Sequence, residues 1–200
     1  MTLKTIVGQF VGMARREILR DHTRSSCIAS TRITIDVFHQ LGFAAEPLEV
    51  VATVGNGAYS RLRATHGPPL NRASLESWAT VQGAQVVGIG HSATTGGVGG
   101  HLVAVVESSV IVDAALDQAN LLVPSLRVPS VVAIELRSGE LNSGLVRRFD
   151  PALFIEYTVR PALNDWRSSP DWQGTPETET AVARIIAKIE ASLGQRPRTE

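Results

Sequence analysis

Two apolar runs separated by only three residues constrain the fold of this chain more than any other feature. Residues 101–106 read His-Leu-Val-Ala-Val-Val, residues 110–113 read Val-Ile-Val-Asp, and Glu-Ser-Ser joins them. Short β-branched runs on both sides of so short a connection are typical of a β-hairpin. The sequence therefore predicts two antiparallel strands here, with a turn centred near residue 107.

The segments around this hairpin predict an α+β fold. Apolar residues at three- and four-residue steps favour an amphipathic helix over about residues 3–19. A second helix is expected over about 26–41, with Gly42 as its stop. Other expected elements are strands at 47–54, 85–89, 131–136 and 153–159, a turn at 55–57, a short helix at 73–81 and a C-terminal helix at about 177–193. Helices first, then mainly antiparallel strands on short turns, then a helix indicate α+β organisation and not a βαβ repeat.

Composition excludes several classes of partner and cofactor. The 19 basic and 19 acidic residues cancel, so the chain lacks the surplus of positive charge that attracts nucleic acid or acidic lipid. The single cysteine excludes an intramolecular disulfide and a multi-cysteine zinc site. His22, His39, His66 and His91 lack the spacing of metal ligands. We therefore expect no cofactor and no metal.

The first residues do not resemble an export signal. Polar side chains interrupt Met1 to Leu19 throughout, and no run reaches the roughly 18 apolar residues that a membrane helix needs. A cytoplasmic protein is the expectation, with export by a route that needs no signal left open.

Cys27 begins the second predicted helix, directly after Ser25 and Ser26. A thiol at a helix N-terminus lies close to unsatisfied N–H groups and to the positive end of the helix dipole, both of which favour the nucleophilic thiolate. The alternative is a buried, unreactive cysteine that packs as a small apolar side chain. Position alone does not decide between the two.

His101 and Asp113 stand at the two open ends of the predicted hairpin. Their even separation places both side chains on the same face of the sheet, where cross-strand neighbours lie roughly 5 Å apart. A carboxylate there would fix the imidazole tautomer and stabilise its protonated form. A structural His–Asp pair is the alternative, and Asp117 is a competing partner for the imidazole.

The order Cys27, His101, Asp113 on a helix and two successive strands resembles the transglutaminase-like superfamily within the papain-like fold, which includes the arylamine N-acetyltransferases. The run from His101 through Asp113 to Gln118 is similar to their signature of histidine, apolar strand, turn, apolar strand, aspartate, small residues and glutamine. The resemblance covers about residues 20–120. It implies a catalytic domain over 1–160 with an insertion at about 57–97, and a loop and helix over 161–200 packed on it.

Two features depart from the pattern of the superfamily. The interval from Cys27 to His101 is longer than usual, and Leu102 stands where many members carry an aromatic residue. The extra length could form a lid, and Gly96–Gly100 a mobile flap beside His101. Both departures leave the specific transglutaminase reaction open.

Acyl chemistry also needs donors for an oxyanion. The backbone N–H of Cys27 is the expected first donor. A second is expected from the 21–26 loop, with Ser26 and the side chain of His22 as candidates. Gln118 is expected either to line the site or to cap the strand. Trp166 and Trp172 are expected to pack the C-terminal helix, with ligand contact as the alternative.

These residues predict a cysteine-nucleophile hydrolase, a peptidase or amidase, that acts through a thioester acyl-enzyme. Its substrates would be peptides, proteins or small amide or acyl compounds. The alternatives are an acyltransferase of the transglutaminase type and a catalytically inactive papain-like binding domain. The sequence gives no indication of the oligomeric state.

Overall fold

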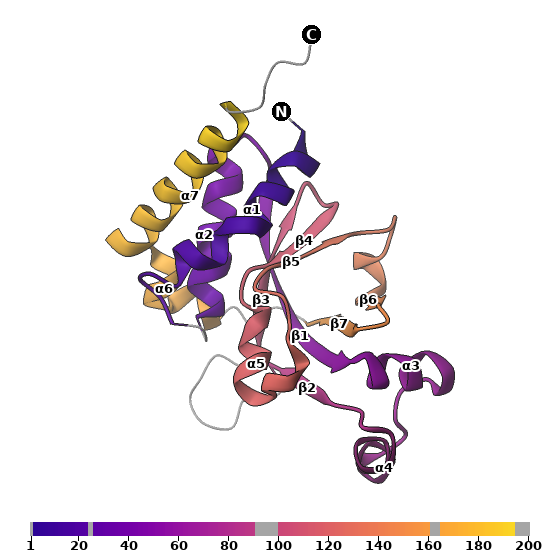
Figure 1. Cartoon of the computed structure of the whole chain (residues 1–200). Helices are drawn as coiled ribbons and strands as arrows, with labels where there is room; N and C mark the ends of the chain where they lie inside the picture. The colour runs from indigo at the N-terminus through magenta and orange to yellow at the C-terminus, as the bar shows by residue number, and fades with distance from the viewer. Residues whose placement is uncertain (1, 24–25, 91–99, 161–164, 195–200) are drawn as a thin grey trace.

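A computed structural model describes residues 2–23, 26–90, 100–160 and 165–194 (Figure 1). The α-helices are α1 (Leu3–Ile18), α2 (Cys27–Gln40), α3 (Gly57–His66), α4 (Arg72–Gln82), α5 (Ala119–Leu122), α6 (Pro170–Gln173) and α7 (Pro176–Gly194). The strands are β1 (Ala45–Asn56), β2 (Val86–Ile89), β3 (His101–Val106), β4 (Val110–Asp113), β5 (Val132–Glu135), β6 (Leu145–Phe149) and β7 (Leu153–Val159). The short 3₁₀ turns include η1 (Leu116–Gln118) and η4 (Asp165–Ser168). The predicted α+β class is confirmed.

The strands form one seven-stranded antiparallel sheet around β1. Six of them follow the order β5-β4-β3-β1-β7-β6, and the seventh, β2, also pairs with β1. The first half of β1 pairs with β3, from Ala45 opposite Val106 to Val50 opposite His101. Its second half pairs with β2 and with β7. Because β2 and β7 share the same residues of β1, they must lie on its opposite edges. The sheet is curled, and the end of β3 that carries His101 lies near its middle.

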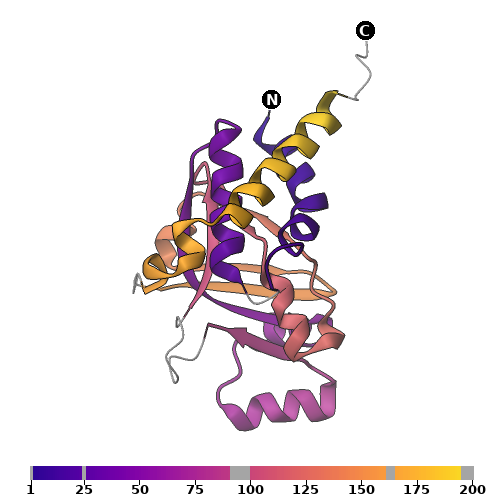
Figure 2. The same cartoon turned by 90° about the vertical axis from the view of Figure 1, so that its left-hand side faces the viewer.

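Three helices cover one face of the sheet. Helices α1, α2 and α7 pack together over β3 and β4, as Figure 1 shows from the side and Figure 2 from the helical face. Their shared core is built from side chains such as Phe10, Ile33, Phe38, Val106, Val112 and Ile185. A second apolar core fills the other, concave face of the sheet, between Val103, Ile111, Leu116 and Tyr157. Hydrophobic burial on both faces fixes the position of the central strands.

Helices α3 and α4 extend away from the helical layer (Figure 2). They occupy residues 57–82, where the sequence predicted only one short helix, at 73–81. The predicted turn at 55–57 was wrong: Gly55 and Asn56 continue β1, and the Asn56 side chain caps α3 by accepting a hydrogen bond from the Tyr59 N–H at 3.0 Å. Helix α4 buries none of its side chains.

The hairpin of β3 and β4 is present, with its turn one residue later than predicted. Val106 pairs with Val110, so the turn is centred on residue 108 and not on 107. Glu107 and Ser108 both have positive φ values, of 50° and 49°, which a tight turn between right-twisted strands requires. The shift moves the residue opposite His101 from 113 to 115. Parity is unchanged, because two residues along a strand return to the same face.

Candidate active site

Cys27 is the first residue of α2, as predicted. Ser26 precedes it as the N-cap, but its side chain forms no capping hydrogen bond. The Ser26 hydroxyl donates instead to the carbonyl oxygen of Thr23, at 2.6 Å. The N–H groups of the first turn of α2 therefore have no side-chain cap and stay available to an anion such as a thiolate. Ser26 shapes the loop and does not present its hydroxyl to the thiol.

One buried hydrogen bond fixes α2 against the strand that carries His101. The hydroxyl of Thr31 donates to the carbonyl oxygen of Leu102 at 2.7 Å. Thr31 lies about one helical turn after Cys27, so both residues lie on the same side of α2. The bond thus holds the beginning of α2 beside the beginning of β3. At this junction the Cys27 thiol lies close enough to the His101 ring and to the Leu102 backbone N–H for both to lower its pKa.

His101 and Asp113 form a fully buried pair. Nε2 of His101 lies 2.7 Å from Oδ2 of Asp113, and neither side chain is exposed to solvent. Because the turn is centred on residue 108, this contact is a diagonal one across the hairpin, which a ring as long as imidazole can span. The carboxylate accepts the Nε2 proton, so Nδ1 is the nitrogen left for the thiol.

Asp113 is held by two further donors. The hydroxyl of Tyr157, on β7, donates to Oδ2 at 2.9 Å, and the backbone N–H of Ala115 donates to Oδ1 at 2.9 Å. Three hydrogen bonds to one buried carboxylate stabilise its charged form and fix its orientation. The sequence analysis missed Tyr157. The one feature of the sequence that could have pointed to Tyr157 is its hydroxyl group, which stands at an inward and otherwise apolar position of a predicted strand.

Cys27 and His101 have pKa values that are shifted in opposite directions, with that of the thiol lowered and that of the imidazole raised. Burial raises the pKa of the Cys27 thiol, but the hydrogen bond and positive charge of His101, together with the Leu102 N–H, outweigh it and bring this pKa below its ordinary value. Burial lowers the pKa of His101, but the charge and hydrogen bond of Asp113 and the contact with Cys27 raise it to about 10. Both shifts favour a thiolate–imidazolium pair near neutral pH.

Gln118 lies at the other ring nitrogen of His101. Its Nε2 is 3.0 Å from Nδ1, and the residue ends the η1 turn that follows β4. The amide group can serve both charge states of the ring: its N–H donates to a neutral Nδ1, and its carbonyl oxygen accepts from a protonated one. Of the two roles expected for Gln118, lining the site is the one the geometry supports.

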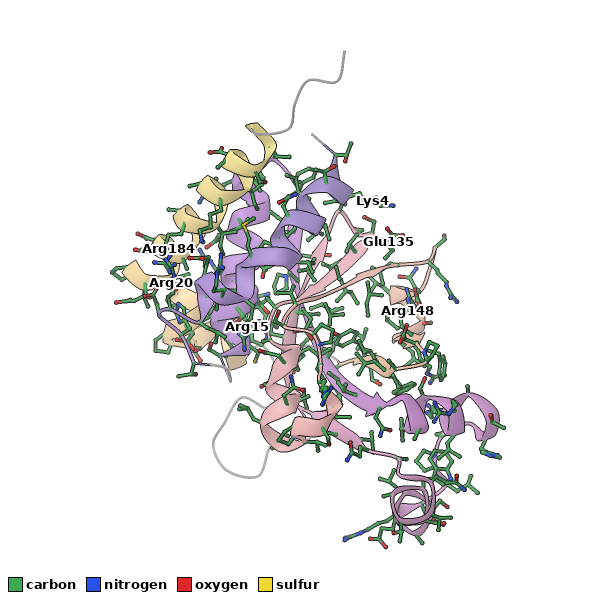
Figure 3. The ribbon with its side chains drawn as sticks, viewed as in Figure 1. Lys4, Arg15, Arg20, Glu135, Arg148 and Arg184 are labelled. Atoms are coloured by element: carbon green, nitrogen blue, oxygen red, sulfur yellow. The ribbon has the colours of Figure 1, made fainter. Side chains whose placement is uncertain are left out.

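Asp117 is not the partner of the imidazole. Its Oδ1 lies 2.6 Å from a guanidinium nitrogen of Arg15, and both side chains are almost fully buried. Arg15 extends from α1, where Figure 3 shows it facing the sheet, and it also donates to the hydroxyl of Ser30 on α2 at 3.2 Å. This ion pair fixes η1, and with it Gln118, relative to the helix that carries Cys27.

Two tryptophans, one in η4 and one in α6, pack in the cluster that contains Cys27. Trp166 is buried, and it packs with Ile28, Leu102, Trp172 and Cys27 in one cluster. The two indole rings meet edge to face, with centroids 4.3 Å apart. Both tryptophans thus lie at the candidate site, where the sequence analysis had expected packing of the C-terminal helix as their main role.

The structure gives less support to the two remaining predictions, His22 and the flap at 96–100. His22 follows α1, and its backbone N–H donates to the Ile18 carbonyl oxygen at 3.0 Å. In the described part of the chain, the Nε2 atom of its ring is buried without a hydrogen-bond partner, and no hydrogen bond joins the ring to Cys27. Of the predicted flap at 96–100, only Gly100 belongs to the described residues, because residues 91–99 lie outside them.

The described residues offer neither a metal centre nor a membrane span. Between 2 and 194, leaving out the undescribed segments, no three His, Cys, Asp or Glu side chains gather as metal ligands would. Within the same ranges, no helix has both the length and the apolar character required to cross a bilayer.

Comparisons with known proteins leave the family of this chain open. No protein-family model, no curated protein and no solved structure matches it. The candidate site therefore rests on its own geometry.

Proposed function

We propose that the chain is a cysteine-nucleophile hydrolase, a peptidase or amidase with a papain-like or transglutaminase-like fold, that acts on amide or ester carbonyls through a thioester. The observation that carries the proposal is the sequence of adjacent groups from the half-buried Cys27 thiol to the buried His101 imidazole and Asp113 carboxylate. A structural His–Asp pair would not need a thiol beside the imidazole ring. Nor would an inert cysteine have its pKa lowered in spite of its burial.

The reaction would proceed in two steps. The Cys27 thiolate attacks the carbonyl carbon, a C–S bond forms, and the carbonyl π electrons move to oxygen to give a tetrahedral oxyanion. As the carbonyl reforms, the bond to the leaving group breaks, and that group takes a proton from Nδ1 of His101. The neutral imidazole then accepts a proton from water, whose oxygen attacks the thioester carbonyl carbon; as the carbonyl reforms, the C–S bond breaks, the acid is released and the Cys27 thiolate returns beside the protonated imidazole. Asp113 holds the ring and stabilises its charge in both steps.

The activated thiol can be tested directly by alkylation with iodoacetamide across pH, followed by mass spectrometry. The lowered pKa predicts that Cys27 reacts with an apparent midpoint below that of an ordinary thiol, because only the thiolate is alkylated. In His101→Ala, burial acts without its opposing charge, so the midpoint should rise above the wild-type value. The matched control is His39→Ala, because His39 lies at the other end of α2.

The chemistry itself can be followed with p-nitrophenyl acetate as a minimal acyl donor. Wild-type protein should release nitrophenol and carry an acetyl group on Cys27, whereas Cys27→Ser should do neither at a comparable rate. Addition of a primary amine separates the two outcomes of the thioester, since an acetylated amine would indicate transfer in place of hydrolysis. If Cys27 of the wild-type protein is alkylated with the pH midpoint of an ordinary thiol and is never acetylated, both hydrolysis and acyl transfer are excluded. The alternative of a binding domain would then remain.

A further inference from the structure

Two aromatic side chains in the described part of the chain bury a ring nitrogen that has no hydrogen-bond partner: His22 at Nε2 and Trp166 at Nε1. Buried donors are almost always paired, so each such atom requires an explanation. Indole Nε1 is a donor only, with no second function as an acceptor. The described residues thus provide no acceptor for the Trp166 indole N–H, which can donate to an acceptor atom of a bound molecule.

Trp166 is the one of these two rings that lies in the cluster containing Cys27. The same cluster contains Ile28, the residue after Cys27, and Leu102, whose backbone N–H lies near the thiol. His22 instead lies close to Glu177, the second residue of α7. The unpaired indole is thus the one beside the nucleophile.

The Trp166 ring is held from two sides. Trp172 meets it edge to face, and the guanidinium carbon of Arg167 lies 4.4 Å from the ring centroid. A cation over an indole withdraws electron density from the ring and strengthens its N–H as a donor. A donor that is fixed in advance in a dry site stabilises developing charge without the cost of reorganisation.

We propose that the Trp166 indole N–H donates a hydrogen bond to the carbonyl oxygen of the substrate as it becomes an oxyanion during attack by Cys27. This inference rests on the proposed thioester function. Trp166 would act together with the backbone N–H of Cys27, which as the first residue of α2 lacks an intrahelical acceptor. The sequence analysis expected the second oxyanion donor in the 21–26 loop. Trp166 would supply it instead, from a segment about 140 residues further along the chain.

Two reactions of the same thiol separate this role from simple packing. Acetylation by p-nitrophenyl acetate passes through an oxyanion, whereas alkylation by iodoacetamide displaces iodide and forms none. Trp166→Phe keeps an aromatic ring but removes the N–H. It should slow acetylation of Cys27 by roughly 10²-fold, as loss of one oxyanion donor does elsewhere, and leave the rate and pH midpoint of alkylation unchanged.

Three further variants complete the experiment. Trp78→Phe, on the distant α4, is the matched control and should acetylate like wild type. Trp166→His, which restores a ring N–H, should recover part of the lost rate. His22→Ala should acetylate at the wild-type rate.

Each failure has a distinct meaning. Wild-type protein that is never acetylated would overturn the proposed function. If Trp166→Phe is acetylated as fast as the wild-type protein, the oxyanion role of Trp166 alone would be overturned. Equal losses of alkylation and acetylation in Trp166→Phe would assign the ring to packing, and a loss confined to acetylation in His22→Ala would move the donor to His22.

Discussion

Asp113 carries the largest concentration of hydrogen bonds in the site, with the imidazole, a phenol and a backbone amide on one buried carboxylate. Burial and the charge of Asp113 raise the pKa of Tyr157 well above its ordinary value. The phenol consequently remains a donor at every pH at which the protein would act. In the proposed function Tyr157 is a positioning residue, because it contacts Asp113 and would act on the imidazole only through that carboxylate.

Replacing Tyr157 by Phe should therefore weaken both the fold and the site. A lost hydrogen bond to a buried charged group is expected to lower the free energy of unfolding by about 1.5–3 kcal/mol, measured by urea denaturation at pH 7. The matched background is Asp113→Asn, in which the phenol no longer faces a charge. The cost of Tyr157→Phe should be smaller there, and equal costs in both backgrounds would show that the bond contributes nothing specific.

At the scale of elements, the site depends on how α1, α2 and η1 are joined. Arg15 of α1 contacts Ser30 of α2 and Asp117 of η1. Cys27 lies one turn before Ser30, and Gln118 directly follows Asp117. One guanidinium thus connects the two backbone segments that carry Cys27, the proposed nucleophile, and Gln118, the amide beside its proposed base.

We expect Arg15→Met to cost about 3–5 kcal/mol in the free energy of unfolding, because it leaves the buried Asp117 without its counter-charge. Arg61→Met, at an exposed position of α3, should change the same quantity by less than about 0.5 kcal/mol. Restoration of stability in Arg15→Met/Asp117→Leu would confirm that the stranded carboxylate causes the loss. A single Arg15→Met variant as stable as wild type would contradict it.

The elements that the sequence did not predict are those whose stability comes from partners elsewhere. Strand β6 contains Arg147 and Arg148 side by side, which hides its alternation of apolar and polar residues. Glu156 and Glu140 neutralise these two charges, and neither contact can be read from local spacing. The hairpin could be predicted because its pairing is local and its alternation is complete.

At the scale of the whole molecule, α7 returns to the first helix of the chain. Glu17 is fully shielded from solvent, and it receives Lys188 at 2.5 Å, Arg184 at 3.4 Å and Arg20 at 3.2 Å. Figure 3 shows Arg20 and Arg184 together at the junction of α1 and α7. The hydrogen bond from Lys188 lowers the pKa of Glu17, against burial, which raises it.

Glu17→Gln should accordingly destabilise the protein in a pH-dependent way. A carboxyl group whose pKa is lowered by folding contributes stability that is complete above its unfolded value, here 4.5, and is lost as pH falls through the folded value. We expect a loss of about 2 kcal/mol at pH 7 that shrinks below pH 4.5, measured by urea denaturation. A difference that stays constant with pH would contradict this assignment.

The candidate site shows the same division between local and distant contributions. Cys27, His101 and Asp113 could be predicted because helix start and hairpin parity are local properties. Tyr157 and Trp166 could not, because only the tertiary fold brings β7 and η4 to the hairpin.

The two ends of the segment before His101 meet. A Cβ on Gly90 would lie 2.9 Å from the backbone of Gly100 and His101, and Gly90 has a φ of 88°. The chain therefore leaves β2 and re-enters β3 at nearly the same point, and both strands are anchored on β1. For a loop with joined ends, closure entropy changes only with the logarithm of its length. The position of His101 is thus set by the pairing of β2 and β3 with β1, and it does not depend on the length or sequence of the residues that join these two strands.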